Sequence, residues 1–332
     1  MPRGKTKPIA HLRACLAWWA AFLLLCSLAC HAQDFPSRSI RLIVPQAPGG
    51  GTDILGRNVA QKLGEQLHQP AIVENRTGAG SLVGTEYVAR APADGYTLLV
   101  GGIFNIVMNK ALIKNISYDP LRDLVPLGFT SAYPFVLLAR PDLPVSNLAE
   151  LVKYAKEKPG SLTYGSAGIG TLQHVWGAIL FKSLGMDALH VPFKGAAAAH
   201  QEMMAGRLDL LFDNMSASKQ YVQSGRLKAL AVSSASRSSH LPEVPTVNET
   251  GLVKFEGESW FGLFAPAGTP APVVGILRKA LAGITGDQEF AARIERDGGR
   301  VLAIPPQEQL RFMREEIERW TQLVARYGVT VD

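Results

Sequence analysis

The stretch Pro48-Gly49-Gly50-Gly51-Thr52-Asp53 joins an apolar run at residues 40–44 to a helical pattern at residues 54–67. Three glycines therefore stand between a predicted strand and the start of a predicted helix. The first N–H groups of a helix lack partners within it and carry a partial positive charge. Because glycines let a ligand approach that backbone closely, the stretch predicts an anion-binding loop.

A simpler interpretation is that this loop only turns the chain, with Thr52 or Asp53 as the N-cap of the helix. One glycine is enough for such a turn, so three in a row favour contact with a ligand. No Gly-Lys-Ser/Thr follows, as a nucleotide-binding P-loop requires, and the dinucleotide fingerprint G-x-G-x-x-G is absent from the loop. The loop therefore does not indicate a nucleotide site.

Short apolar runs alternate with helical patterns along the rest of the chain. The predicted strands are residues 40–44, 71–74, 96–100, 135–139, 162–164, 208–212, 227–232 and 260–264. The predicted helices are residues 54–67, 84–90, 147–156, 172–184, 197–205, 272–284 and 308–327. This order predicts an α/β fold with parallel sheets covered by helices, and the length of 332 residues favours two domains.

A second glycine-rich loop, GSAGIGT at residues 165–171, follows the predicted strand 162–164. Ligands of α/β sheets bind at the carboxyl ends of strands, so two such loops facing each other would form a cleft between domains. Ser166, Thr171 and backbone N–H groups are expected to donate to a carboxylate there. An enzyme would instead use Ser166 as a nucleophile with His174 as its base, but the nucleophile elbow G-x-S-x-G is missing. His174 lies one helical turn after Thr171 and is expected to brace the loop.

Asp213 follows the apolar run 208–212, where it either takes a ligand ammonium or caps the next helix. The histidines after residue 32 form neither H-x-x-x-H nor H-E-x-x-H, so we predict no metal site and no cofactor.

The first 32 residues predict a secretory signal peptide. A basic start is followed by an apolar run from Ala14 to Cys30, and cleavage is expected after Ala32. A membrane anchor and a lipoprotein attached through Cys30 are the alternatives. All three cysteines lie in this leader, so the mature chain has neither a thiol nucleophile nor a disulfide. The leader takes four of the 34 Lys and Arg residues, and the remaining 30 nearly balance 28 Asp and Glu, which argues against nucleic-acid binding.

Several motifs resemble, in order, the Bug/TctC family of periplasmic solute-binding receptors of tripartite tricarboxylate transporters. These motifs are VPQAPGGGTD at 44–53, ENRTGAG at 74–80, DGYTL at 94–98, YDP at 118–120, VPFKG at 191–195, FDN at 212–214, LPEVPT at 241–246 and APAGTP at 265–270. The resemblance implies an α/β periplasmic-binding-protein (type II, Venus-flytrap) fold with two crossovers. Its domains would be residues 33–131 plus 257–332 and residues 132–256.

The resemblance also implies that a small carboxylate is held between the two loops. The implied binding positions are Gly50, Gly51, Thr52, Asp53, Ser166, Ala167, Gly170, Thr171, His174 and Asp213. The chain departs from the family pattern where Phe104-Asn105-Ile106 replaces a frequent Ser-Thr-His run, and where Trp176 replaces a small residue. We expect Asn105, Trp176 and Asp213 to contact the far end of the ligand.

The resemblance implies a monomeric, non-enzymatic protein outside the cytoplasmic membrane. Its partners would be a small organic anion, which is a dicarboxylate, tricarboxylate, amino acid or aromatic acid, and the membrane subunits of a tripartite tricarboxylate transporter. A sensor that passes the signal to a kinase is the main alternative, and a hydrolase using Ser166 is a weaker one.

Overall fold

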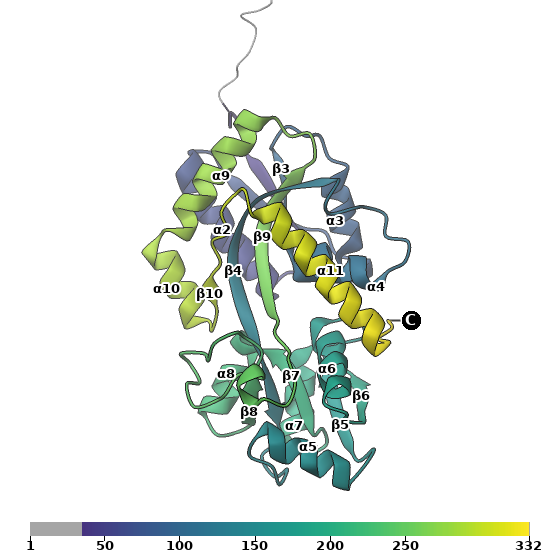
Figure 1. Ribbon diagram of the computed structural model, residues 1–332. Coiled ribbons are helices and arrows are strands. Elements are labelled where there is room, and N and C mark those ends of the chain that lie inside the picture. Colours follow the sequence, from purple (N-terminus) through teal and green to yellow (C-terminus); the bar gives the residue numbers. More distant parts are fainter. Residues whose placement is uncertain (1–34, 332) are drawn as a thin grey trace, which may run out of the picture. The chain divides into compact units, whose positions relative to one another are not determined.

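A mixed sheet organises the chain in the computed structural model, which describes residues 35–331 (Figure 1). Its path is β2-β1-β3-β9-β4-β7-β5-β6, with β8 and β10 also paired to β4. The strands are β1 (Ile40–Val44), β2 (Ala71–Asn75), β3 (Thr97–Gly102), β4 (Leu124–Ala139), β5 (Leu162–Ser166), β6 (Ala188–Pro192), β7 (Leu210–Asn214), β8 (Lys228–Val232), β9 (Glu258–Pro266) and β10 (Arg300–Val301).

Helices follow most of the strands. They are α2 (Gly51–Leu67), α3 (Leu82–Ala89), α4 (Asn109–Leu112), α5 (Leu148–Glu157), α6 (Leu172–Ser183), α7 (Ala196–Met204), α8 (Met215–Gln223), α9 (Ala271–Thr285), α10 (Gln288–Arg296) and α11 (Gln309–Tyr327). Short turns complete them: η1 (Ala79–Ser81), η2 (Phe104–Met108) and η3 (Asn248–Thr250). The residues from Arg38 onward form one compact unit.

The strand β4 divides the sheet into two groups of strands. We call β1, β2, β3, β9 and β10 with the first part of β4 the first half-sheet, because β9 pairs with β4 from Leu124 to Pro134. We call β5, β6, β7 and β8 with the end of β4 the second half-sheet, because β7 pairs with β4 from Phe135 to Ala139. Figure 1 shows β4 continuing from one group into the other beside β9.

The expectation of purely parallel sheets is wrong in part. β1 pairs in parallel with β2 and β3, and β5 with β6 and β7, as the alternation of strands and helices predicts. The strands that join the two groups are antiparallel, since β9 runs against β3 and β4, and β7 and β8 run against β4. The α/β fold is confirmed, with a mixed sheet.

The core extends across both half-sheets. Its largest buried side chains include Phe129 and Phe264 in the first half-sheet and Phe212 in the second. Trp176 of α6 and Trp320 of α11 are fully buried and stack with ring centroids 4.7 Å apart and an angle of 11° between the rings. This stack packs α11 onto the second half-sheet. The bulky Trp176 is therefore a core residue and does not line a ligand site.

The leader prediction cannot be assessed from the fold, because residues 1–32 lie outside the described residues. In the described part of the chain, the helices are too short or too polar to cross a lipid bilayer. Within the same residues, no group of three or more His, Cys, Asp or Glu side chains is arranged to hold a metal ion.

Candidate functional site

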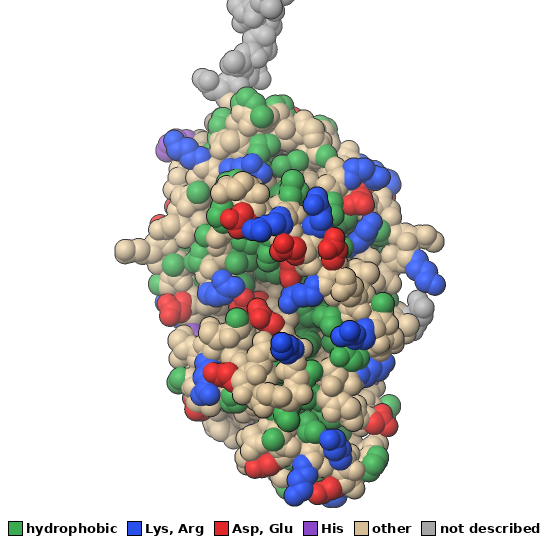
Figure 2. Space-filling view, viewed as in Figure 1, with side chains coloured by type: hydrophobic (Ala, Val, Ile, Leu, Met, Phe, Trp, Pro, Cys, Tyr) green, Lys and Arg blue, Asp and Glu red, His purple; other side chains and the backbone are tan. Residues whose placement is uncertain are grey.

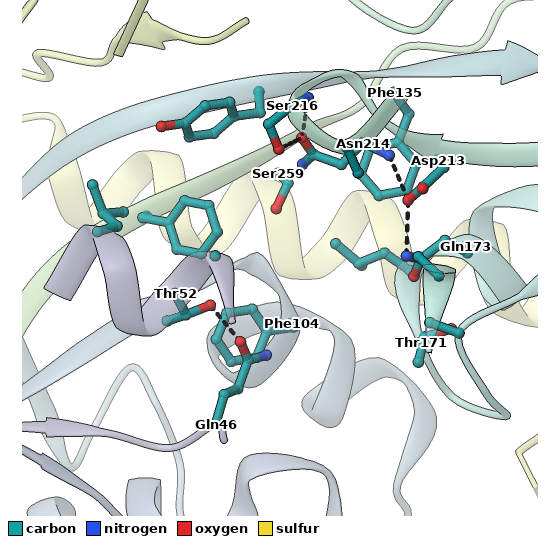
Figure 3. Close-up of a pocket in the computed structure, with 18 of the residues that line it drawn as sticks. Gln46, Thr52, Phe104, Phe135, Thr171, Gln173, Asp213, Asn214, Ser216 and Ser259 are labelled. Carbon is teal, nitrogen blue, oxygen red and sulfur yellow. Dashed lines mark hydrogen bonds between the residues drawn. The ribbon is translucent and has the colours of Figure 1, made fainter. Parts of the chain in front are cut away.

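A cleft of about 1170 Å³ lies where the two half-sheets meet, and both glycine-rich loops contribute to its lining. Gly51 and Thr52 at the start of α2 line it from the first half-sheet, and Ala167, Gly170 and Thr171 before α6 line it from the second. In Figure 3, Thr52 and Gln46 lie on one side of an open space, and Thr171, Gln173 and Asp213 lie on the other. The two loops therefore contribute to one cavity.

The first loop presents the N-terminus of α2 to this cleft. The helix begins at Gly51, earlier than predicted, with Gly50 as an N-cap that has no side chain to satisfy the first N–H groups. The first helical hydrogen bond runs from the Ile54 N–H to the Gly50 carbonyl over 3.0 Å. A Cβ atom added at Gly51 would meet no heavy atom within 4 Å. The start of α2 is therefore open to a ligand.

Asp53 lies in the first turn of α2, but its charge is directed away from the cleft. Its carboxylate accepts hydrogen bonds from the Gly49 N–H at 3.0 Å, Arg57 Nε at 3.0 Å and Asn75 Nδ2 at 2.9 Å. The hydrogen bond from Arg57 is the main reason that the pKa of Asp53 falls to about 2. A carboxylate held in this way favours the helix start and fixes the glycine loop, while its negative charge is neutralised locally.

The second loop owes its shape to two glycines and to Ser166. Gly168 has a φ of 133° and Gly170 a φ of 80°, which are values that side-chain-bearing residues rarely adopt. The Ser166 hydroxyl accepts from the Gly168 N–H at 3.1 Å. Thr171 is the N-cap of α6, and its hydroxyl donates to the Gly168 carbonyl at 2.7 Å. The loop is thus built to hold the start of α6 in a defined position.

Two stacked histidines support this loop from behind. His190 Nε2 lies 2.7 Å from Ser166 Oγ, and the rings of His174 and His190 stack with centroids 4.1 Å apart. His174 Nδ1 accepts from the Gly170 N–H at 3.2 Å. Burial lowers the pKa of both imidazoles, that of His190 to about 4, and the neighbouring His174 adds to the effect on His190. Both rings are therefore neutral near pH 7. The hydrogen-bond partner of Ser166 is His190 and not His174.

Asp213 is the last residue but one of β7, lines the cleft and is nearly completely buried. Its Oδ1 accepts from Gln173 Nε2 at 2.9 Å and from the Asn214 N–H at 2.7 Å (Figure 3). Its Oδ2 lies 3.2 Å from Nε2 of buried His200, although the two atoms are not aligned for a regular hydrogen bond. Burial raises the pKa of Asp213 and lowers that of His200. Asn214, not Asp213, caps α8.

The predicted binding residues fall into two groups. Those in the cleft lining are Gly51, Thr52, Ala167, Gly170, Thr171 and Asp213. Those placed behind the lining are Gly50, Asp53, Asn105, Ser166 and His174, and four of these shape the loops just described. Asn105 is fully buried, where its side chain accepts from the Gly102 N–H at 2.8 Å and donates to Thr85 at 2.7 Å. Its amide is therefore satisfied within the first half-sheet.

Sequence reasoning missed the residues that supply most of the remaining lining. They include Gln46, Ser81, Phe104, Tyr133, Gln173, Asn214, Ser259 and Phe261. Phe104 and Gln173 each lie one position before a residue that we predicted, Asn105 and His174. Their positions on η2 and α6 could have indicated this. Neighbouring residues on a helix point in different directions, so a residue beside a predicted one can face the cleft when the predicted one does not.

Charges of both signs are interspersed on the face of the protein that α11 crosses (Figure 2). On α11 itself, Arg319 lies 2.6 Å from Glu316, and Arg311 lies 3.2 Å from Glu308 just before the helix. This face thus carries a mixed charge pattern, in agreement with the near balance of acidic and basic residues after the leader.

The chain matches the family model described as "Tripartite tricarboxylate transporter family receptor" over residues 55–329. It is 32% identical to BugT of Bordetella pertussis over 298 residues, covering 90% of this chain and 91% of BugT. A Rhodopseudomonas palustris protein solved with adipate shares 33% identity with a TM-score of 0.80, covering 90% of this chain and 99% of that one. MatC from the same organism, solved with bound malate, shares 32% identity with a TM-score of 0.76, covering 87% and 100%.

These similarities extend over most of the chain, and the family model covers the second glycine-rich loop and the strands that join the two half-sheets. The chain therefore belongs to the Bug/TctC family, the periplasmic solute-binding receptors of tripartite tricarboxylate transporters, which are not enzymes.

Proposed function

We propose that the protein captures a small organic carboxylate in the cleft and delivers it for uptake. The observation that carries this proposal is that the N-termini of α2 and α6 open into the same cavity, each preceded by a glycine-rich loop. Two helix N-termini around one cavity supply several N–H groups and two positive dipole ends, which suit a carboxylate group. The adipate and malate that accompany two of the similar structures agree with this class of ligand.

The ligand carboxylate would bind to the N–H groups at Gly51 and Thr52 on one side and to those at Leu172 and Gln173, in the first turn of α6, on the other. Micromolar affinity requires about −8 kcal/mol. A hydrogen bond to a charged group contributes about 1.5–3 kcal/mol and a helix dipole adds up to about 2 kcal/mol, so four or five donors suffice after the cost of association. Neither loop contains an arginine, so the proposed mode of binding uses backbone donors.

The proposal includes two further elements. The domains would be residues 33–131 plus 257–332 and residues 132–256, which close around the ligand by a hinge motion. The protein would act in the periplasm after loss of the signal peptide, and the liganded form would dock on the membrane subunits of a tripartite transporter. Both elements follow from the family and the predicted leader.

The test is calorimetric titration of the purified protein with adipate, malate, citrate, glutamate and benzoate, together with the variant Gly51→Val. A valine at position 51 would project into open space at the start of α2 and should obstruct the ligand without straining the fold. We expect at least one acid to bind, and we expect the variant to lose at least tenfold in affinity.

Gly275→Val is the matched control, because a Cβ atom there also meets nothing within 4 Å and the position is an exposed one in α9. The control should retain wild-type affinity. Absence of binding by every acid, or equal affinity of the Gly51→Val variant, would contradict the proposal.

A further inference from the structure

A row of aromatic rings lines one wall of the cleft. The ring centroids of Phe104 and Phe261 lie 6.2 Å apart, and those of Phe261 and Tyr133 lie 6.1 Å apart. Phe104 is half-buried in η2, directly after β3, while Phe261 and Tyr133 belong to the neighbouring strands β9 and β4. Figure 3 shows Phe104 among the side chains around the open space. The wall is a rigid apolar surface, because two of its three rings are anchored in the sheet.

Two isoleucines extend this apolar surface from the two loops. Ile54 in the first turn of α2 is 47% exposed and Ile169 in the second loop is 57% exposed, and both line the cleft. Large exposed apolar side chains are unfavourable in water unless something covers them, so a cluster of them in a cavity is informative. Their position beside the proposed carboxylate site indicates that the part of the ligand next to its carboxylate is apolar.

Several polar side chains of the cleft, in contrast, are paired with one another. The Thr52 hydroxyl donates to Gln46 Oε1. Gln173 donates to Asp213 at 2.9 Å, and Asn214 accepts from the Ser216 hydroxyl at 2.7 Å (Figure 3). A ligand rich in hydroxyl or carboxylate groups would have to break these pairs to gain hydrogen bonds.

The charged side chains of the lining offer little to a second carboxylate. The Lys219 ammonium group donates to the Arg296 carbonyl. Arg293 and Arg296 are exposed on α10, where hydrated guanidinium groups contribute little to affinity. The distribution of charge therefore favours a ligand with one carboxylate.

We infer, on the basis of the proposed function, that the ligand is an aromatic monocarboxylate whose ring packs on the wall formed by Phe104, Phe261 and Tyr133. Its carboxylate binds the N–H groups at the starts of α2 and α6, and Ile54 and Ile169 cover the ring. Aromatic rings pack well edge-to-face or offset at centroid distances of this order, and such packing adds to the burial of apolar surface.

The test compares phenylacetate and benzoate with adipate, malate and acetate by calorimetric titration of the wild-type protein. Acetate has the same carboxylate without a ring, so its affinity isolates the contribution of the aromatic wall. We expect an aromatic acid to bind at least tenfold more tightly than adipate, malate and acetate. Equal or tighter binding of adipate or malate overturns this inference and leaves the proposed function standing. Failure of every acid to bind contradicts both.

Variants at position 104 test the wall itself. Phe104→Ser should weaken phenylacetate binding about tenfold, while Phe104→Leu, which keeps an apolar side chain, should lose less. Ile72→Ser is the control, because it also replaces an apolar side chain by serine, but Ile72 lies exposed on β2, outside the cleft lining. Melting curves of all three variants verify folding. An unchanged affinity in a folded Phe104→Ser protein contradicts the assignment of this wall.

Discussion

An acidic side chain in a cleft proposed to hold an anion needs a physical explanation, and at residue scale its burial beside His200 supplies it. Asp213 and His200 are 1% and 3% exposed in their side chains and lie 3.2 Å apart. Burial favours the uncharged form of each, and their attraction favours the charged form of both. Burial has the larger effect, so the pKa of Asp213 lies above its usual value and that of His200 lies below it. Burial thus disfavours a negative charge on Asp213 in the cleft.

Replacing either member of this pair should make the stability depend on pH, with slopes of opposite sign in the two variants. In His200→Leu, the remaining Asp213 has a pKa raised by burial, so the folded state binds more protons than the unfolded state, and stability falls as the pH rises above about 4. In Asp213→Asn, the remaining His200 has a pKa lowered by burial, so stability falls as the pH drops below about 6.5. Urea unfolding between pH 5 and pH 8 measures both slopes.

Each single variant should lose about 1–3 kcal/mol at its unfavourable pH, because it leaves a buried polar group without its partner. The double variant His200→Leu/Asp213→Asn serves as the control and should show neither slope. Slopes of the same sign in the two single variants would contradict the opposite pKa shifts of Asp213 and His200.

The sequence placed Asp213 at the end of a strand, but it did not reveal His200 as its partner. His200 lies on α7, and a histidine in an alanine-rich helix has no periodicity that shows which strand end it faces. The same limit applies to Asn105. Its position next to β3 was predicted, but the direction of its side chain was not. Polar residues are placed by the tertiary packing around them, and that packing involves residues far away in the sequence.

At the scale of elements, the predicted strands and helices lie within a few residues of those observed, but α8 and α10 were not predicted and β4 was predicted only in part. β1 matches the predicted 40–44, and α11 begins one residue after the predicted start. β4 was predicted only at 135–139 but begins at Leu124, because Pro126, Gly128 and Pro134 in its first part are typical of turns. The pairing of β4 with β9 offsets these weak local preferences.

The glycines of β4 and β9 are required by how closely the two strands approach. A Cβ atom added at Gly262 would lie 2.6 Å from the Gly128 carbonyl oxygen, a backbone atom that cannot turn away. We expect Gly262→Ala to lower the free energy of unfolding by about 1–3 kcal/mol. Chemical denaturation measures the loss.

Gly275→Ala is the matched control for this substitution. Gly275 lies in α9 with open space around its added Cβ atom, so alanine there should be neutral or stabilising by about 0.4–1 kcal/mol. If both variants had the same stability as the wild type, the close approach of β4 and β9 would not be a constraint on the fold.

At the scale of the whole molecule, the alternation of strands and helices indicated the α/β class but not how the two half-sheets are joined. The antiparallel pairing of β9 with β3 and β4 brings residues 258–266, late in the chain, against strands formed by its first half. No local pattern encodes such a pairing. The motifs around the two loops predicted a shared cleft, because the carboxyl ends of parallel strands meet at one edge of a sheet. This prediction does not depend on how the two half-sheets are joined.

The joining elements also determine how the two half-sheets would move if the cleft closes on a ligand. α11 is tied to the second half-sheet by the Trp176–Trp320 stack and by the Lys182 ammonium, which donates to the Tyr327 carbonyl at 2.8 Å. β4 is continuous through both half-sheets, and its pairing with β9 shifts register between Phe129 and Ser131. Strands bend most readily at such irregularities, so closure should pivot there while the contacts of α11 persist.

Closure should therefore reduce the radius of gyration when an acid that binds is added at saturating concentration, and small-angle X-ray scattering measures this change. An acid that calorimetry shows not to bind, added at the same concentration, is the control, since the protein should then scatter as the ligand-free wild type does. Identical scattering of the wild type with and without a ligand that calorimetry shows to be bound would exclude a hinge motion. In that case the carboxylate would be held between the starts of α2 and α6 as they already stand, and the loops alone would provide its donors.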